Sequence, residues 1–184
     1  MKVISRDSGH SWSLPVSLPD HVLSARPQML MMSPKGPLLL TGGRPHLMLW
    51  VSHDGTGNDW DPINLAQEHN RRQKDPSLKF CEAFANGTST WLESTCYNSI
   101  QRIADSPNGQ PTALVCYDRM GTEPPAAPKE CQPSMVSTFC MKVSVIPHQA
   151  RVAPPSRHGA RGQRPHSAIQ GQEHASTNSI SVET

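Results

Sequence analysis

Short apolar runs separated by turn residues make up most of the first 146 residues of this chain. Each run has the length of one strand, and each gap between runs carries Gly, Pro, Asn or Asp, which interrupt strands and form turns. The tripeptide Pro-Asn-Gly at 107–109 stands between two such runs and signals a hairpin loop. The pattern predicts an all-β domain of sequential antiparallel hairpins, with runs at residues 28–33, 38–43, 46–52, 99–104, 112–118 and 138–146.

Two segments depart from this strand pattern. Residues 63–74 are largely polar and are equally compatible with one short helical turn and with a polar loop. From residue 147 onward the chain has no aromatic residue and few branched aliphatic ones, so it cannot bury enough apolar surface to offset the entropy of ordering. We predict a folded domain at 1–146 and a disordered tail at 147–184.

A short pattern occurs twice in the first third of the chain. At 3–12 and again at 49–60, an apolar strand runs into Ser-x-Asp, then a Gly-containing turn, then Trp. The two aspartates, Asp7 and Asp54, are about 47 residues apart, a separation that suits one four-stranded propeller blade.

We interpret this pattern as a hairpin that locks itself. The Asp carboxylate accepts hydrogen bonds from backbone N–H groups of the loop, Gly supplies a positive φ, and the Trp ring folds back across the hairpin. Such a turn needs no substrate. We therefore assign Asp7 and Asp54 a structural role and no catalytic one.

Composition and charge exclude several classes of function. The formal net charge is only +2, which does not indicate a nucleic-acid partner or a charged membrane surface. No apolar stretch approaches the roughly 20 residues of a membrane-spanning helix, and no signal peptide precedes the first charged residues. We expect no nucleic-acid partner and no membrane insertion.

The cysteines and histidines do not predict a metal or cofactor site. The five cysteines form no C-x-x-C pair and their number is odd, which is a poor pattern for a disulfide framework or a zinc site. We interpret them mostly as small buried hydrophobic residues. The nine histidines are scattered without a ligand spacing, so we predict no metal and no cofactor.

The segment Ser-Arg-Asp-Ser-Gly-His-Ser-Trp at 5–12 resembles the Asp-box, or bacterial neuraminidase (BNR) repeat, of the sialidase superfamily. Residues 42–60, 94–119 and 138–146 resemble, in the same order, sialidase segments with an arginine before a strand, a tyrosine before a hairpin, and a closing strand. The resemblance covers roughly 1–146. It implies the C-terminal part of a six-bladed β-propeller, about two to three blades.

The resemblance also implies an activity, the hydrolysis of terminal sialic acids from sialylated glycans by an exo-α-sialidase. Sialidases differ from most glycosidases in using a tyrosine nucleophile, because the substrate carboxylate repels an anionic one. Tyr97 matches that nucleophile, and Arg44 matches the third of three arginines that hold the carboxylate. The alternative interpretation, without the resemblance, is that Tyr97 is a buried tyrosine at a strand edge and Arg44 is a solvated arginine of a loop.

Other parts of the family's catalytic set have no match in this sequence. The glutamate that activates the tyrosine lies upstream of the third arginine in the family, whereas the first glutamate here is Glu68. The other two arginines and the acid/base aspartate would precede Met1. We expect a truncated sialidase-like protein with weak or no hydrolase activity. The alternative is a non-catalytic Asp-box propeller fragment that binds glycans or proteins.

Overall fold

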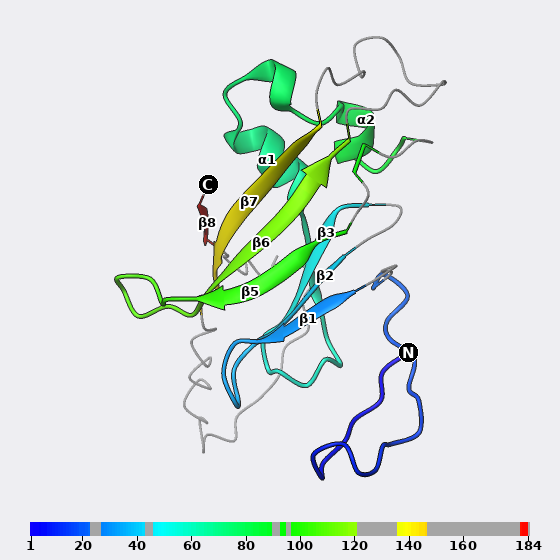
Figure 1. Cartoon of the computed structure of the whole chain (residues 1–184). Coiled ribbons are helices and arrows are strands. Elements are labelled where there is room, and N and C mark those ends of the chain that lie inside the picture. The colour runs from blue at the N-terminus through cyan, green and yellow to red at the C-terminus, as the bar shows by residue number, and fades with distance from the viewer. Residues whose placement is uncertain are drawn as a thin grey trace, which may run out of the picture.

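The computed structural model describes residues 1–22, 27–42, 46–89, 93–94, 97–120, 136–146 and 181–183. Its strands form two antiparallel sheets of four strands each, and in both sheets the strand order follows the chain (Figure 1). The prediction of an all-β class with sequential antiparallel pairing is confirmed, and a few short helices are added to it.

The first sheet consists of β1 (Gln28–Met31), β2 (Leu38–Gly42), β3 (Met48–Ser52) and β4 (Asp61–Asn64). The predicted runs at 28–33, 38–43 and 46–52 therefore each contain one strand. A tight turn closes β1 onto β2, where the Gly36 N–H donates to the Ser33 carbonyl at 3.0 Å.

The second sheet consists of β5 (Ser99–Ile103), β6 (Thr112–Arg119), β7 (Ser137–Ser144) and β8 (Ser181–Glu183). β8 pairs with the C-terminal end of β7 and lies within the predicted tail. The remainder of 147–184 lies outside the described residues.

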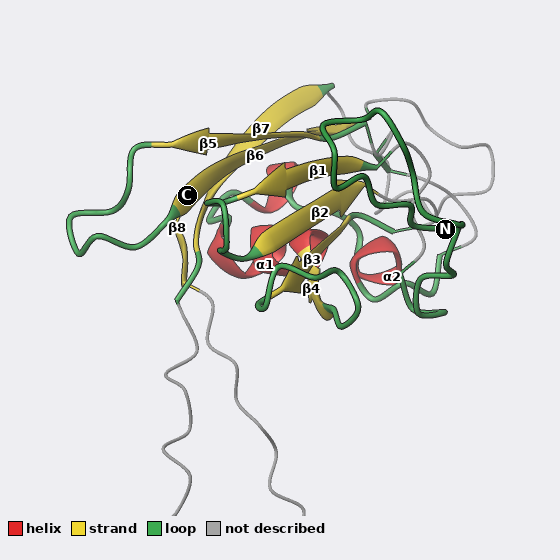
Figure 2. Ribbon diagram, turned by 90° about the horizontal axis from the view of Figure 1, so that it is seen from below, coloured by secondary structure: helices red, strands yellow, loops and turns green. Residues whose placement is uncertain are grey.

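The part of the chain that connects β4 to β5 contains α1 (Leu65–Arg72), the 3-10 turn η1 (Pro76–Leu78) and α2 (Glu82–Ala85). The polar segment at 63–74 thus contains a helix of about two turns, after two residues that end β4. Asn64 begins it, because its side chain accepts a hydrogen bond from the Gln67 N–H, as an N-cap residue does. α1 packs against α2 and β3, and Figure 2 shows both helices beside the sheets.

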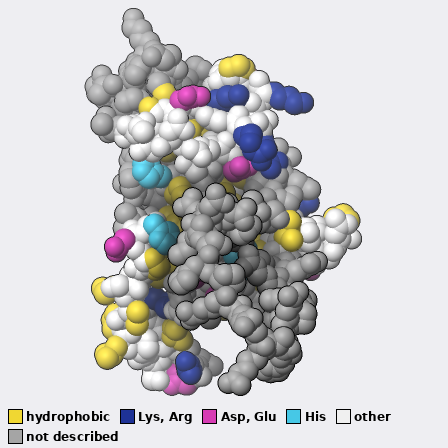
Figure 3. Space-filling view, turned by 180° about the vertical axis from the view of Figure 1, so that it is seen from behind, with side chains coloured by type: hydrophobic (Ala, Val, Ile, Leu, Met, Phe, Trp, Pro, Cys, Tyr) yellow, Lys and Arg dark blue, Asp and Glu magenta, His cyan; other side chains and the backbone are white. Residues whose placement is uncertain are grey.

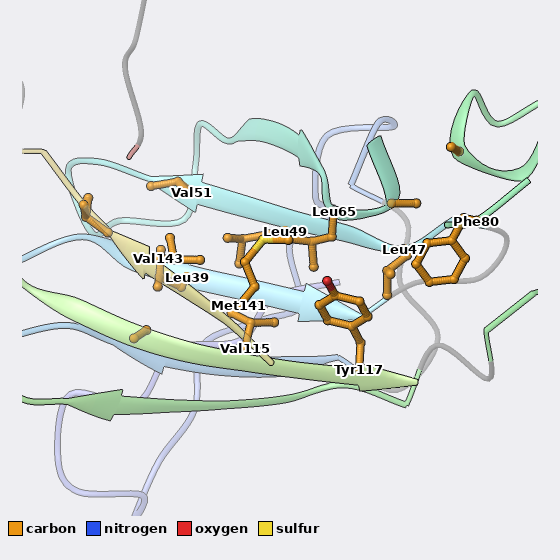
Figure 4. Close-up of a cluster of buried hydrophobic side chains, with 14 of the residues drawn as sticks. Leu39, Leu47, Leu49, Val51, Leu65, Phe80, Val115, Tyr117, Met141 and Val143 are labelled. Carbon is orange, nitrogen blue, oxygen red and sulfur yellow. The ribbon is translucent and has the colours of Figure 1, made fainter. Parts of the chain in front are cut away.

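The main core lies between the two sheets (Figure 4). Side chains of β2 and β3, such as Leu39 and Leu49, meet side chains of β6 and β7, such as Val115 and Met141. All four are fully buried. Burial of a side chain of this size contributes about 1.5–3 kcal/mol, so this layer is the largest single source of stability in the described chain.

Both faces of the first sheet are covered. Leu38, Leu40 and Trp50 point to the face opposite Leu39 and form a second cluster with Trp60. Strands that are buried on both faces read as continuous apolar runs. This explains why β2 and β3 lack the alternation that β6 shows.

Cysteine pairing corrects the sequence interpretation. Cys116 and Cys140 stand directly opposite each other on β6 and β7, with a Cα–Cα distance of 4.1 Å, and form a disulfide. Cys81 is also disulfide-bonded. The interpretation of the cysteines as mostly hydrophobic packing residues was wrong, because the strand register that makes two of them neighbours is not visible in their spacing.

Both Ser-x-Asp turns have the hydrogen bonds expected of a self-locking hairpin. The Asp7 carboxylate accepts the Ser11 N–H at 2.9 Å and the Ser11 hydroxyl at 2.6 Å. These bonds, with one from Ser5, lower the pKa of Asp7 to about 2. In the second turn, Asp54 accepts the Thr56 N–H at 2.9 Å, and its pKa is lowered too, first by that bond. The structural role predicted for both aspartates is confirmed.

The tryptophans of the two turns differ in burial. Trp60 is 2 % exposed and its indole N–H donates to the Gly57 carbonyl at 3.0 Å, whereas Trp12 is 62 % exposed. The carboxylate locks each turn locally, but a Trp is buried only if a neighbouring sheet covers it. The first sheet supplies that cover for Trp60 through Leu38 and Trp50.

A histidine joins three elements of the helical segment and the second sheet. The buried His69 of α1 lies 3.0 Å from the Leu78 carbonyl through Nε2 and 3.1 Å from the Tyr117 hydroxyl through Nδ1. Because a carbonyl only accepts, Nε2 carries the proton and Nδ1 accepts from Tyr117. Burial is the main cause that lowers the pKa of His69, with Arg119 and Lys79 adding to it, so the ring is neutral.

We expect Trp60→Ala to destabilise the protein by about 3–5 kcal/mol, because it empties a buried site. Trp12→Ala, in the matching turn, should change stability by less than about 1 kcal/mol. Urea unfolding followed by far-UV circular dichroism measures both. Equal losses for the two variants would contradict the difference in burial.

The neutral state of His69 predicts a pH dependence of stability. Since its folded pKa is below its unfolded value of about 6.5, the unfolded chain binds more protons as the pH falls, and stability present above pH 6.5 is lost below it. The slope for one proton reaches at most about 1.4 kcal/mol per pH unit. Urea unfolding at pH 7.5 and 5.5 should show a smaller loss in His69→Phe than in the wild type. An identical pH dependence would show that His69 does not titrate as described.

Candidate functional site

The connections between the strands of the first sheet lie at its two opposite ends. In an antiparallel meander, alternate connections lie at the same end. The β1–β2 turn and the Ser-x-Asp turn between β3 and β4 therefore lie together, and a Cβ placed on Gly55 would meet the Gly36 carbonyl. The β2–β3 connection lies at the other end of the first sheet.

Two hydrogen bonds fix how the second sheet lies against the first. At one end, the buried Asn98 amide donates to the Thr41 hydroxyl of β2 at 2.9 Å. At the other end, the Arg102 guanidinium of β5 donates to the Met32 carbonyl beyond β1, and it pairs with Asp105 at 2.9 Å. β5 thus runs beside the first sheet, with its beginning next to the end of β2.

Tyr97 lies at this junction, one residue before the buried Asn98 and two before β5. Its side chain is 44 % exposed. The interpretation as a buried strand-edge tyrosine therefore does not hold. A nucleophile must be reached by its substrate while its backbone stays fixed, and Tyr97 combines an accessible ring with an anchored neighbour.

Arg44 lies outside the described residues, but both sides of its segment are described. Before it, Gly42 ends β2 with a φ of 139°, a value that favours glycine. Thr41 accepts from Asn98, and its own hydroxyl donates to the Met48 carbonyl at 3.2 Å, across the connection. Arg44 follows Thr41, the residue that accepts the hydrogen bond from Asn98, by three positions in the sequence.

The charged residues at the end of β6 are structural. Arg119 is 5 % exposed, and its guanidinium donates to the Ser77 carbonyl at 2.6 Å. Burial lowers its pKa, and the buried Glu93 opposes this shift electrostatically. Asp118 accepts the Ser94 hydroxyl at 2.8 Å. These contacts hold the end of β6 against the residues around Ser77 and Ser94.

No protein-family model, curated protein or solved structure matched the chain. Within the described ranges, no three His, Cys, Asp or Glu side chains gather closely enough to hold a metal ion. None of the helices in those ranges is long and apolar enough to cross a membrane. The functional inference therefore rests on the residues themselves and on the end of the sheets where Tyr97 lies.

Sequence reasoning identified Tyr97 but missed the two residues that position it. Thr41 and Asn98 are short polar residues inside or beside apolar runs, a pattern that by itself gives no contact. Their burial, 0 % for Thr41 and 6 % for Asn98, and their mutual hydrogen bond appear only when the sheets are packed together.

Removal of the Thr41 hydroxyl should loosen the support of Tyr97. We expect Thr41→Val to destabilise the protein by about 1–3 kcal/mol, because it leaves the buried Asn98 amide without this acceptor. Thr88→Val is the matched control, since the Thr88 hydroxyl bonds only at an exposed position. Urea unfolding measures both, and equal effects would contradict a special role for the Thr41–Asn98 bond.

Proposed function

We propose that this protein is a sialidase-like protein of the β-propeller class, with its sugar site at the end of the sheets where β5 begins. The observation that carries the proposal is the Asn98–Thr41 hydrogen bond, which joins the chain next to Tyr97 to the chain that leads to Arg44. Tyr97 and Arg44 are 53 positions apart in sequence, and this bond joins described residues that lie one position after Tyr97 and three positions before Arg44.

Several features support a propeller architecture. Each sheet is a four-stranded antiparallel meander, and β1 and β5 pack beside each other (Figure 1). The first Asp-box closes a further hairpin, in which Lys2 and Val16 form an antiparallel bridge. The Lys2 ammonium donates to the Gly57 carbonyl of the second Asp-box at 3.0 Å. Sheets repeated in this manner correspond to the blades of a propeller, with β1 and β5 as inner strands.

The proposed chemistry assigns one role to each residue. Arg44 holds the substrate carboxylate through its planar fork of N–H donors. The Tyr97 hydroxyl gives its proton to water as its oxygen bonds to the anomeric carbon, and the bond to the leaving-group oxygen breaks as that oxygen takes up a proton from solvent. Water then hydrolyses the tyrosyl intermediate and returns a proton to the tyrosine.

The second candidate function is glycan binding without hydrolysis. In the sequence as given, Glu68 is the first glutamate and follows Arg44, whereas the family's activating glutamate precedes the matching arginine. Both candidates use the same surface and the same two residues. They differ only in whether the glycosidic bond is cleaved.

We expect the protein to bind N-acetylneuraminate and to bind its methyl ester at least about tenfold more weakly, because esterification removes the carboxylate charge. Arg44→Gln should weaken binding of the acid by a similar factor, and Arg71→Gln, an exposed arginine paired with Glu68, should not. Ligand-observed NMR titrations measure these affinities. Equal binding of acid and ester would exclude both candidate functions.

Hydrolysis separates the two candidates. With a fluorogenic sialoside, a slow rate in the wild type that Tyr97→Phe abolishes would establish the enzyme. Tyr117→Phe is the matched control, because Tyr117 is the other tyrosine of the chain and is buried. Equal background rates in the wild type and Tyr97→Phe, together with binding of the acid, would identify a glycan-binding protein.

A further inference from the structure

A second concave site lies away from Tyr97, where the C-terminal turn of α1 meets β6 and β7. Its cavity volume is about 290 Å³. The site is lined by two cations, Arg72 and Lys74, by the rings of His69, Tyr117 and Phe139, and by Cys140. Tyr97 is not part of this lining, and it precedes β5 on the opposite edge of β6 from β7.

The polar groups in the wall of this pocket are held in place. His69 is fixed by the Leu78 carbonyl and by the Tyr117 hydroxyl, as described above. Its ring meets Phe139 edge to face, with the ring centroids 4.5 Å apart. The disulfide of Cys140 to Cys116 joins the two strands that form this wall. A site whose walls are locked in this way needs little reorganisation to accept a ligand.

The electrostatic character of the pocket is positive. Arg72 and Lys74 line it, and Arg119 and Lys79 lie close enough to lower the pKa of His69. The facing carboxylate is Glu68, which lies 2.6 Å from Arg71 and 3.5 Å from Arg72.

Arg72 lines the pocket with a side chain that is 22 % exposed. Its Nε atom is buried and lies 3.5 Å from the Glu68 carboxylate, so a ligand would meet the terminal N–H groups of the guanidinium. Figure 3 shows Lys and Arg side chains gathered toward the top of the molecule, where Figure 1 places α1.

The rest of the wall is apolar. Tyr117 and Phe139 present ring surface, and the ring of His69 is neutral. The volume lies just below the range of about 300–1,000 Å³ that is typical of pockets for drug-sized ligands, so the site suits a small ligand. A phosphate group would leave the ring surfaces without contacts, whereas a ligand with an anionic head and a flat apolar body would use both parts of the site.

We propose that this pocket binds a small organic carboxylate with an aromatic or aliphatic body, its carboxylate at Arg72 and Lys74 and its body against Tyr117 and Phe139. This site is separate from the proposed sugar site and does not depend on it. Its ligand is smaller and more apolar than a sialic acid.

Benzoate is the probe for this proposal, titrated into the full chain and followed by ligand-observed NMR. We expect benzoate to bind with a dissociation constant in the millimolar range or tighter, and Arg72→Gln to weaken binding at least about tenfold. Arg71→Gln is the matched control, because Arg71 precedes Arg72 on the same helix, also pairs with Glu68, and does not line the pocket. Benzyl alcohol, which has the same ring without the charge, should bind more weakly than benzoate.

Three outcomes would overturn the proposal. One is the absence of benzoate binding at about 10 mM to the folded wild-type protein. Another is an equal loss of affinity in Arg71→Gln and Arg72→Gln, which would indicate non-specific attraction to the basic helix. The last is inorganic phosphate binding as tightly as benzoate, which would show that the apolar wall contributes nothing. Unchanged benzoate binding in Tyr97→Phe would support the separation of the two sites.

Discussion

The packing of β2 and β3 against β6 and β7 is the constraint on which the rest of the structure depends. Each sheet alone would expose one apolar face to water, and burying the two faces together removes that cost. Leu39, Leu49, Val115 and Met141 are fully buried in this layer. Once the faces are in contact, β5 must lie beside β1, so the beginning of β5 meets the end of β2. The position of Tyr97 is therefore a consequence of core packing.

Polar interactions then fix details that the apolar layer leaves free. The Asp7 and Asp54 carboxylates close their turns with bonds inside the loop, so those turns need no partner to form. His69 differs, because its two ring nitrogens bond to the Leu78 carbonyl and to the Tyr117 hydroxyl. These bonds connect α1, η1 and β6 and form only when all three elements are in place. Buried polar groups of this kind stabilise a structure only when they are satisfied, and they thereby select one arrangement of the helices over others.

The surfaces for which we propose functions lie in different regions of the fold. One end of the first sheet is occupied by the self-closing turns, and the other holds Thr41, Asn98 and the accessible Tyr97. The helical segment adds a third region, where Arg72 and Lys74 stand beside aromatic rings. In both proposed sites, a charged or nucleophilic side chain is accessible while its neighbours are buried and hydrogen-bonded, which is what precise binding requires.

The sequence by itself determined the strand runs and the two Ser-x-Asp turns, because apolar periodicity, turn residues and local side-chain bonds act over a few residues. Only the tertiary structure decided the rest. The spacing of Cys116 and Cys140 gave no sign of their disulfide, and the polar segment at 63–74 became a helix because the core buries Leu65 and His69. The Thr41–Asn98 bond likewise joins residues 57 positions apart. Such contacts depend on strand register and sheet packing, which local pattern does not encode.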